Sequence, residues 1–514
     1  MTSSYGQILR SSSIIGAASV INIALGLLRI KVAAILLGPA GVGMIGLMTS
    51  LTSTASAVSG LGFGSVGTRQ IAESVGRNDL VAVGAVRRAL FWGTMTLALL
   101  GAALFWHLRD VFALWVLGDA FLVGDVGWLA IAVGLTVAAA SQMALLNGMR
   151  QIGNLARLTV LSGLLTTALG IGSLTLWGRD GLVAFIIAAP LSSFLLGHMY
   201  VARLPKIQEP RTPIAVLVGQ WRVLATLGSA FMLAGLVGTL GQLLVRTMVQ
   251  KQLGVDNLGY FQAASTISMT YIGFVLTAMG TDFYPRLTAA IQDSVAVNRL
   301  VNEQTEIAIL LASPVLLAMM GLAPWLIELL YSSSFDVATE VLRLQLFGDV
   351  LKVASWPLGF IILAAGDGRK FVLTEAFAVS VFVLLTWFGL PLMGVAATGV
   401  AYAAMYTLHL PLMYLLAWRR TRFSWQRHVF MQLIFLFVIT LFIYLVTIWS
   451  NFFGAVIGVV AALTFSAYTL ARLAQIVNIS GALGQVAKNS QKLMKLMGVL
   501  QLQNTHQRDN DSCS

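Results

Sequence analysis

Residues 27–50 read LLRIKVAAILLGPAGVGMIGLMTS, two apolar runs that meet at the corner Gly38-Pro39-Ala40-Gly41. Each run belongs to a segment that can cross the apolar core of a bilayer, which is about 30 Å thick and needs about 20 helical residues. Proline cannot continue a regular helix, and it pushes the residue before it toward extended geometry. The stretch therefore predicts two membrane-spanning helices joined by a tight turn.

The same corner recurs further along the chain, within Leu243–Gly259. The matching glycines are Gly38 and Gly254, Gly43 and Gly259, which lie 216 residues apart, and Gly148 and Gly366, which lie 218 apart. Chance matches arise in a chain rich in leucine and glycine, but two sets at nearly one offset favour an internal duplication. Transporters are often built from such repeats, with the cargo bound between them.

The composition is that of a membrane protein: 58% of the 514 residues are hydrophobic and only 10% are charged. A soluble protein would carry about a quarter charged residues. The net charge of +12 does not indicate a nucleic-acid partner, because the basic residues are spread over short loops rather than along one face. The single cysteine, Cys513, excludes a disulfide framework and a cysteine-rich metal site.

Fourteen apolar segments predict an all-α polytopic fold, at residues 13–37, 40–64, 89–108, 126–146, 158–177, 181–202, 223–249, 258–281, 304–330, 345–365, 371–390, 394–417, 428–449 and 452–474. With the N-terminus inside, the connecting segments place 24 of the 32 basic residues on the cytoplasmic side, four outside and four within helices. Because lysine and arginine are enriched in cytoplasmic loops, this division predicts that both termini are cytoplasmic.

A polar connection with three prolines, residues 203–213, falls where the repeat begins again. Six crossings return the chain to the same side, so two lobes built from the repeats would be parallel copies about an axis along the membrane normal. In the tail, an amphipathic stretch at Lys488–Leu500 either lies on the inner membrane surface or takes no part. We expect a six-helix lobe at 1–202, a linker at 203–222, a second six-helix lobe at 223–417, an additional helix pair at 418–474 and a cytoplasmic tail at 475–514.

Polar residues follow one face of the first predicted helix and one face of the seventh. The first carries Asn22 and Arg29, and the seventh carries Gln242, Arg246 and Gln250 at four-residue spacing. Tight helix packing explains small and hydroxyl residues in membranes, but it gives no reason to bury a guanidinium group. The two faces therefore predict a wet, cationic cavity that binds the substrate, with the two arginines facing each other where the repeats meet.

Other charged residues also lie within predicted helices. Lys31 lies about 200° around the first helix from the arginine, so we expect it to have different surroundings in the cavity, or to reach the interface. Asp349 and Lys352 either form a structural pair or leave the acid free to couple to an ion. Glu375 is a candidate proton carrier, unless it pairs with loop cations near the inner surface, and Glu328 is a third candidate for ion coupling.

Signatures of an enzyme are missing from the sequence. It has no glycine-rich phosphate loop that ends in Gly-Lys-Ser/Thr, and its five histidines lack metal-ligand spacing. No predicted outer loop is long enough for a catalytic domain. We therefore expect no catalytic residues, metal or cofactor, and a function in binding and movement.

Three short motifs resemble those of a known family. The motif Leu28-Arg29-x-Lys31-x5-Leu37-Gly38-Pro39-x-Gly41 resembles the first helix of Wzx-type flippases, the polysaccharide-transporter branch of the MOP superfamily, which includes the MATE exporters. Leu253–Ala263 is similar to the family's corner between helices 7 and 8, and Tyr284–Leu287 with Val301–Gln304 is similar to its loop between helices 8 and 9. The resemblance covers about residues 10–420. Relatives often carry an acid beside the helix-7 arginine, where this chain has Val245, which argues against cation coupling there.

The resemblance implies translocation of an undecaprenyl-diphosphate-linked oligosaccharide across the bacterial inner membrane, for O-antigen, enterobacterial common antigen or exopolysaccharide assembly. The implied partners are that lipid-linked oligosaccharide, membrane lipids, and the polymerase and chain-length regulator of the same pathway, with no nucleic acid. A diphosphate is a natural partner for arginine, and two rocking lobes would give alternating access.

Three other functions compete with this one. A MATE-like exporter of small organic cations shares the fold, but its cavity should favour acids. A lipid-linked glycan polymerase or ligase should carry a sizeable outer loop. A flippase for the peptidoglycan precursor is the nearest alternative, because its cargo has the same lipid diphosphate and fourteen helices suit it.

Overall fold

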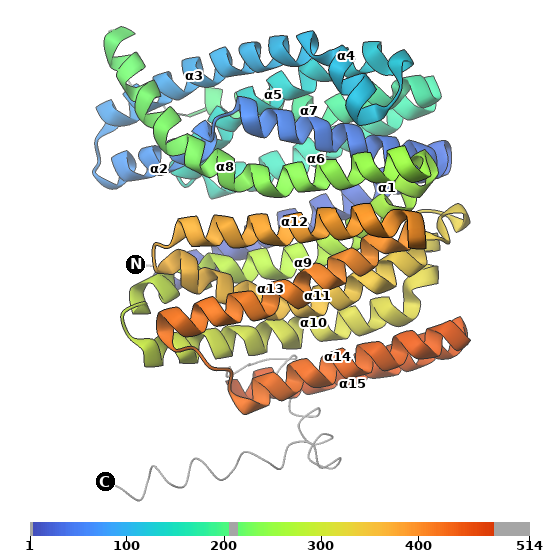
Figure 1. The fold of residues 1–514 in the computed structure, drawn as a ribbon. Helices are drawn as coiled ribbons and strands as arrows, with labels where there is room; N and C mark the ends of the chain where they lie inside the picture. The colour runs from blue at the N-terminus through green and yellow to red at the C-terminus, as the bar shows by residue number, and fades with distance from the viewer. Residues whose placement is uncertain (1–3, 205–213, 477–514) are drawn as a thin grey trace, which may run out of the picture. The chain divides into compact units, whose positions relative to one another are not determined.

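The computed structural model describes residues 4–204 and 214–476, in which helices are joined by short turns (Figure 1). Part of the expected linker and the tail with Lys488–Leu500 lie outside the described residues. The α-helices are α1 (Ser4–Ser59), α2 (Phe63–Gly76), α3 (Leu80–His107), α4 (Arg109–Phe112), α5 (Val123–Gly148), α6 (Ile152–Trp177), α7 (Leu182–Ala202), α8 (Ile214–Leu253), α9 (Val255–Ala290), α10 (Ser294–Leu330), α11 (Ala338–Ala364), α12 (Gly368–Met393), α13 (Ala396–Thr421), α14 (Arg427–Trp449) and α15 (Asn451–Ile476). Short π- or 3₁₀-helical turns are η1 (Ala113–Leu117), η2 (Ala120–Leu122), η3 (Gly178–Gly181) and η4 (Ser333–Phe335).

The expected all-α polytopic fold is confirmed. In the described chain, eleven helical stretches are long and apolar enough to cross a membrane. Two of these stretches suffice for two crossings each: Gly16–Ser59, with 44 residues and a corner at Gly38, and Ile152–Ala202, with 51 residues that contain α6 and α7. These stretches therefore allow thirteen crossings, and α9, with 36 residues, is long enough for one more but is not counted among them, which is close to the fourteen expected from the sequence.

One predicted span is wrong at its end. The span at 40–64 stops at Ser59, because Leu61 and Gly62 have positive φ angles of 45° and 66° and the helix cannot continue through them. A new helix, α2, begins at Phe63, in a region where no helix was predicted. The other predicted spans begin and end inside observed helices or within two residues of them.

Left-handed backbone corners recur at one spacing. The pairs of residues with positive φ that lie 216 apart are Gly38 and Gly254, Arg150 and Gly366, and Gly178 and Gly394. Helices α6 and α12 also begin and end 216 residues apart. This register pairs Gly366 with Arg150, whereas the sequence comparison paired it with Gly148, because the corner conformation and not the residue type is what repeats. The recurrence supports an internal duplication.

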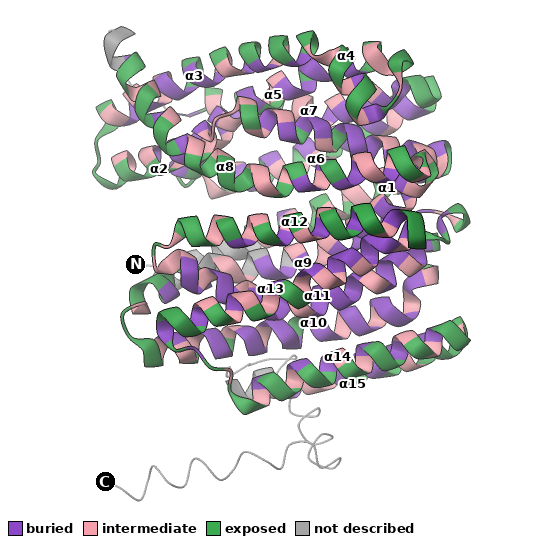
Figure 2. Ribbon diagram, viewed as in Figure 1, coloured by how far each residue is buried: buried purple, intermediate pink, exposed green. Residues whose placement is uncertain are grey.

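The helices pack into two compact units. One contains the chain up to Thr266 together with Ile327–Val341 and Val372–Ala401, and there α5 packs against α2, α3 and α7 while α6 packs against α1 and α7. The other contains Ile267–Leu326, Leu342–Phe371 and the chain from Tyr402. In this unit α10 and α11 are mostly buried, whereas α14 carries exposed residues along its length (Figure 2). The division into lobes at 1–202 and 223–417 stays a prediction.

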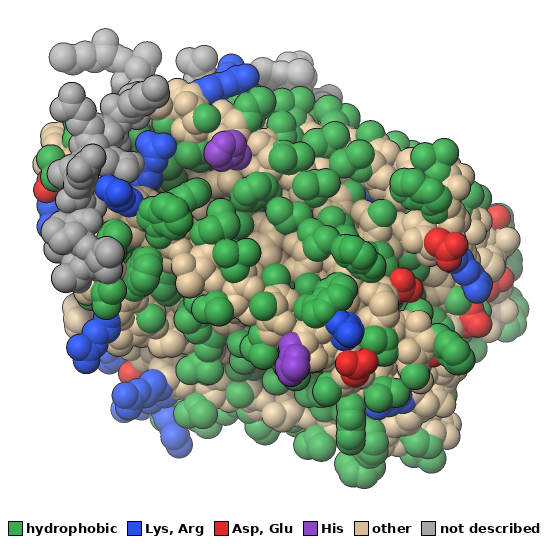
Figure 3. All heavy atoms as spheres, turned by 90° about the horizontal axis from the view of Figure 1, so that it is seen from above, with side chains coloured by type: hydrophobic (Ala, Val, Ile, Leu, Met, Phe, Trp, Pro, Cys, Tyr) green, Lys and Arg blue, Asp and Glu red, His purple; other side chains and the backbone are tan. Residues whose placement is uncertain are grey.

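The surface has the pattern expected of a protein in a bilayer. On the face drawn in Figure 3, hydrophobic side chains cover the middle, and lysine and arginine side chains gather at the left end. Bulky apolar residues such as Phe435, Phe442 and Trp449 on α14 are more than half exposed. Lipid chains would cover such residues at no hydrophobic cost, which explains why they are not buried.

Candidate functional site

Arg246 lies at the centre of a polar cluster in the first unit, formed by side chains of membrane-spanning helices. It lies on α8, two turns before the corner at Gly254, and is only 7% exposed. Its Nε donates to Gln262 Oε1 on α9 at 2.9 Å, and its Nη1 donates to Gln242 Oε1 at 2.6 Å and to the Gln242 backbone oxygen at 3.3 Å. The Phe261 ring centre lies 5.7 Å from Cζ.

The hydrogen-bond acceptors around Arg246 are neutral. Those that the described chain supplies are amide oxygens of Gln242 and Gln262, which leave the positive charge of the guanidinium uncompensated. Gln262 is itself held, because its Nε2 donates to Thr266 Oγ1 at 3.0 Å. A buried cation without a counter-charge is costly, and such residues mark binding sites in membrane proteins. Chemically, the cluster can bind an anion whose oxygens match the guanidinium fork, such as a phosphate.

Glycines allow α9 to approach α1 at this site. A Cβ on Gly43 would lie 2.7 Å from the backbone nitrogen of Gly259, and Gly46 lies directly against the side chain of Gln262. In both contacts the partners are 216 residues apart, so equivalent positions of the repeat touch each other. This close approach places Gln262 where it can accept from Arg246.

Arg29 and Asn22 both contact the helices that follow α5. Arg29 Cζ lies 5.1 Å from the centre of the Phe185 ring on α7, and its buried Nε has no hydrogen-bond partner in the described chain. Asn22 is exposed, and its Oδ1 lies against Gly163 of α6. Arg29 and Arg246 therefore have separate neighbours, and their facing each other stays a prediction.

Lys31 lies in different surroundings from Arg29, as the helical spacing predicted. Its Nζ donates to the backbone oxygen of Glu328 at 2.9 Å. The side chain of Glu328 belongs to an exposed residue near the end of α10. The contact that joins these two residues thus involves a main-chain oxygen, and it leaves the Glu328 carboxylate available to other groups.

Gln250 lies apart from the Arg246 cluster. Its Nε2 donates to the backbone oxygen of Leu117, where η1 ends, and its Oε1 is buried without a partner in the described chain. The next residue, Lys251, has its Nζ 5.6 Å from the centre of the Trp115 ring. The structure therefore brings Gln242 to Arg246 and places Gln250 against η1.

The predicted ion-coupling acids lie in different environments. Asp349 is fully buried in the second unit and accepts from Ser268 Oγ at 2.6 Å and from the Tyr402 hydroxyl at 3.0 Å. Lys352 Nζ donates to the same hydroxyl at 3.4 Å, so Tyr402 bridges the acid and the lysine that were expected to pair. Glu375 is half-buried on α12.

Sequence reasoning did not single out Gln262 and Phe261 as site residues. Arg246 precedes the corner at Gly254 by eight residues, and Gln262 follows it by eight. Two helices that run in opposite directions from a tight corner bring equally distant residues to the same depth. Counting outward from the corner could therefore have identified Gln262.

Comparison with known proteins gives a consistent picture. The family described as polysaccharide biosynthesis protein matches residues 32–340. A lipid III flippase of Escherichia coli (strain K12) is 25% identical over 426 residues, which is 79% of this chain and 97% of that protein. The fold is similar to an inward-facing multidrug resistance MATE family transporter of the MOP superfamily, with TM-score 0.67 and 16% identity over 79% of this chain and 98% of that one. It is also similar to the lipid II flippase MurJ in an inward closed conformation, with TM-score 0.67 and 14% identity over 89% of this chain and 99% of that one.

Proposed function

Because the chain belongs to the family of polysaccharide biosynthesis proteins, we propose that it is a flippase that moves a diphosphate-linked lipid oligosaccharide across the bacterial inner membrane. The similarity to a lipid III flippase along nearly the whole of that protein supports this cargo class. The observation that carries the proposal is the burial of Arg246 among neutral acceptors.

In this proposal Arg246 binds the diphosphate while the lipid chain stays in the bilayer. Gln242 and Gln262 hold the plane of the guanidinium, so its remaining donors point in fixed directions and little entropy is lost when phosphate oxygens bind. Arg29, Lys31, Asn22 and Gln250 complete the polar path of the cargo. The protein acts as a transporter and not as an enzyme, and the polymerase and chain-length regulator of the pathway would receive the cargo outside.

Ion coupling and orientation are further parts of the proposal. Both termini are cytoplasmic, in keeping with the distribution of basic residues. Asp349, Glu375 and Glu328 are the acids through which an ion gradient would act, and Asp349 is the most buried of them. The fold similarity to MurJ extends over 89% of this chain, which supports a peptidoglycan precursor as the second candidate cargo.

The test uses export of a surface glycan in cells that lack their own flippase. Arg246→Ala should reduce export at least about tenfold, because a charge-assisted contact to phosphate contributes about 1.5–3 kcal/mol. Arg246→Lys should restore only part of it, since an ammonium group cannot reproduce the planar fork. Lys251→Ala, on the same helix and exposed, is the matched control and should export normally.

Protein levels are measured alongside export in every strain. Native export by Arg246→Ala at normal protein level would overturn the role of the cluster. The cargo is identified by supplying purified protein in liposomes with either a lipid-linked oligosaccharide or a lipid-linked disaccharide–peptide. Faster flipping of the second would favour the peptidoglycan precursor.

A further inference from the structure

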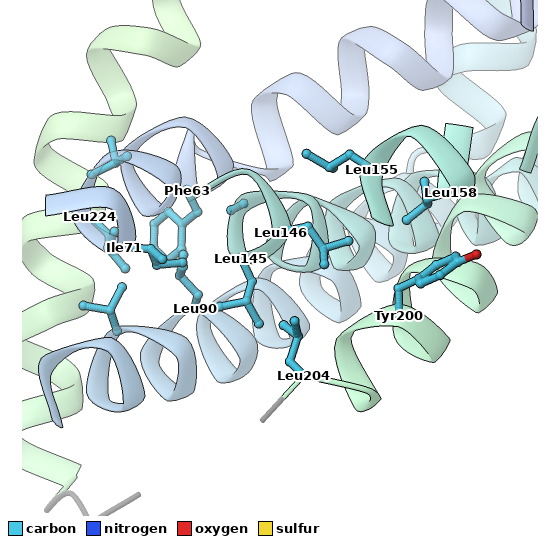
Figure 4. Packing of buried hydrophobic residues seen from close by; sticks show 13 residues of the cluster. Phe63, Ile71, Leu90, Leu145, Leu146, Leu155, Leu158, Tyr200, Leu204 and Leu224 are labelled. Carbon is cyan, nitrogen blue, oxygen red and sulfur yellow. The ribbon is translucent and has the colours of Figure 1, made fainter. Parts of the chain in front are cut away.

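Helix α2 is held against the first unit by its apolar face. Phe63, Ile71 and Val66 of α2 lie in a buried cluster that includes Leu90 of α3 and Leu224 of α8 (Figure 4). Leu145 and other residues of α5, α6 and α7 complete the cluster. Burial of these residues fixes α2 as part of the helical bundle, and Gln70 and Ser74 follow Phe63 on the same face, one turn apart, toward the end of the helix.

The C-terminal half of α2 and the start of α8 form a pocket of about 490 Å³. Its lining residues are Gln70, Glu73, Ser74 and Arg77 of α2, Val86 of α3, and Gly219, Gln220 and Val223 of α8. The Glu73 carboxylate is paired with Arg69, so Arg77 is left as a positive charge in the lining. Two amides and a hydroxyl add both donors and acceptors.

The walls of the pocket are fixed by hydrogen bonds. Arg69 Nε contacts Glu73 Oε1 at 2.8 Å along α2, and the Trp221 indole donates to the backbone oxygen of Ala89 at 2.8 Å, which anchors α8 to α3. In contrast, the amide oxygen of Gln220 is buried and has no hydrogen-bond partner in the described chain. A buried acceptor without a donor is unfavourable, and a donor from a bound molecule would satisfy it.

We propose that this pocket binds the sugar part of the cargo before translocation, an inference that rests on the proposed function. Each sugar hydroxyl both donates and accepts, so a mixture of amide, carboxylate, guanidinium and hydroxyl groups suits it. The apolar side chains of Val86 and Val223 offer contact for the C–H face of a sugar ring.

The pocket and Arg246 contact the cargo at successive stages. Gln220 and Arg246 lie on the same helix, 26 residues apart, which corresponds to about 39 Å along a helix at 1.5 Å per residue. This length exceeds the apolar core of about 30 Å. Under the predicted orientation, the pocket lies on the cytoplasmic side, where the sugars of the cargo stand before it is moved.

The experiment measures binding to the full-length protein in lipid nanodiscs. The probes are two short-chain prenyl diphosphates, one that carries an oligosaccharide and one without sugar. The double variant Gln70→Leu with Gln220→Leu should weaken binding of the sugar-bearing probe about thirtyfold, because two lost hydrogen bonds contribute about 1 kcal/mol each. Binding of the sugar-free probe should not change. Thr226→Val, which removes a hydroxyl from α8 outside the pocket, is the matched control and should bind both probes normally.

Ser74→Ala is a milder variant that is less prone to misfold. It should weaken binding of the sugar-bearing probe alone, by about threefold. Equal affinity of the native protein for both probes, or unchanged affinity in the pocket variants, would overturn the sugar pocket. In that event, weaker binding of both probes by Arg246→Ala would still support the proposed function. Failure of the native protein to bind either probe would count against the proposed function itself.

Discussion

Arg246 and Asp349 are both buried, but they differ in their hydrogen-bond partners and in whether an opposite charge lies nearby. Arg246 has neutral acceptors, whereas Asp349 accepts from two hydroxyl groups and lies one hydroxyl away from Lys352. The helical spacing predicted that Gln242 would join Arg246. Spacing along α8 alone does not reach Gln262; the equal count outward from the corner at Gly254 indicates its depth, and the close approach of α9 to Gly46 holds it in place. Periodicity identifies residues on one helix face, but contacts between helices depend on tertiary packing.

Substitution of Asp349 tests its assignment as a coupling acid. Asp349→Asn keeps the size of the side chain and one of the two oxygens that accept from Ser268 and Tyr402, replaces the other with a donating NH2 group, and removes the charge. We expect export to fall at least about tenfold and to stop responding when the proton gradient is collapsed, since a charged form is needed for coupling.

Ser268→Ala is the control for Asp349, because it removes one hydrogen bond and retains the acid. It should lower export by no more than a few-fold and keep the response to the gradient. Gradient-sensitive export by Asp349→Asn would assign Asp349 a structural role.

Hydropathy predicted the long helices well, because a segment of about 20 apolar residues has few alternatives in a bilayer. Helix α2 was missed for the same physical reason: it has 14 residues, and its polar face excludes it from the apolar core. The corners were predicted where glycine and proline stand together, at Gly38. The corner at Arg150 was not predicted, since arginine rarely adopts the left-handed conformation that this position requires.

Arg150 and Gly366 provide a matched test of that conformation. Arg150 has φ of 52° and Gly366 has φ of 77° at equivalent places of the repeat. Arg150→Gly should raise the free energy of unfolding by about 1 kcal/mol, because glycine adopts positive φ without steric cost.

Gly366→Ala should lower the free energy of unfolding by a similar amount. No atom lies within 4 Å of a Cβ built at Gly366, so the cost is conformational and not steric. Thermal unfolding of both variants in detergent measures the two effects. A destabilised Arg150→Gly would show that the arginine side chain makes a compensating contribution at the corner.

For the whole molecule, the number of crossings was predictable but the attachment of the last two helices was not. In the second unit, Glu306 of α10 accepts from Arg472 Nε of α15 at 2.7 Å and lies 3.3 Å from His428 Nε2 of α14. Asn302, one turn earlier on α10, bonds the backbone at Ser424 and Gln426. These contacts fasten the additional helix pair to α10. The sequence contains all six residues, but the partners in each contact lie more than 120 positions apart, beyond the reach of local patterns.

Reporter fusions test the orientation of the chain. Fusions at Leu117 in η1 and at Ser334 in η4 should report the outer side, and a fusion at Gly76 at the end of α2 should report the cytoplasm. The reason is the concentration of basic residues in the segments assigned to the cytoplasm. A cytoplasmic signal at Ser334 would mean that α8, α9 and α10 do not all cross the membrane.

The contact between Gly43 and Gly259 also limits how this protein can evolve. After a gene duplication, the two halves of a chain are normally free to accumulate mutations independently. Here equivalent positions of the two halves are in contact, and a side chain on either glycine would clash with the main chain of the other half. Each position must therefore stay glycine for the two helices to remain this close, whatever residue stands at the other.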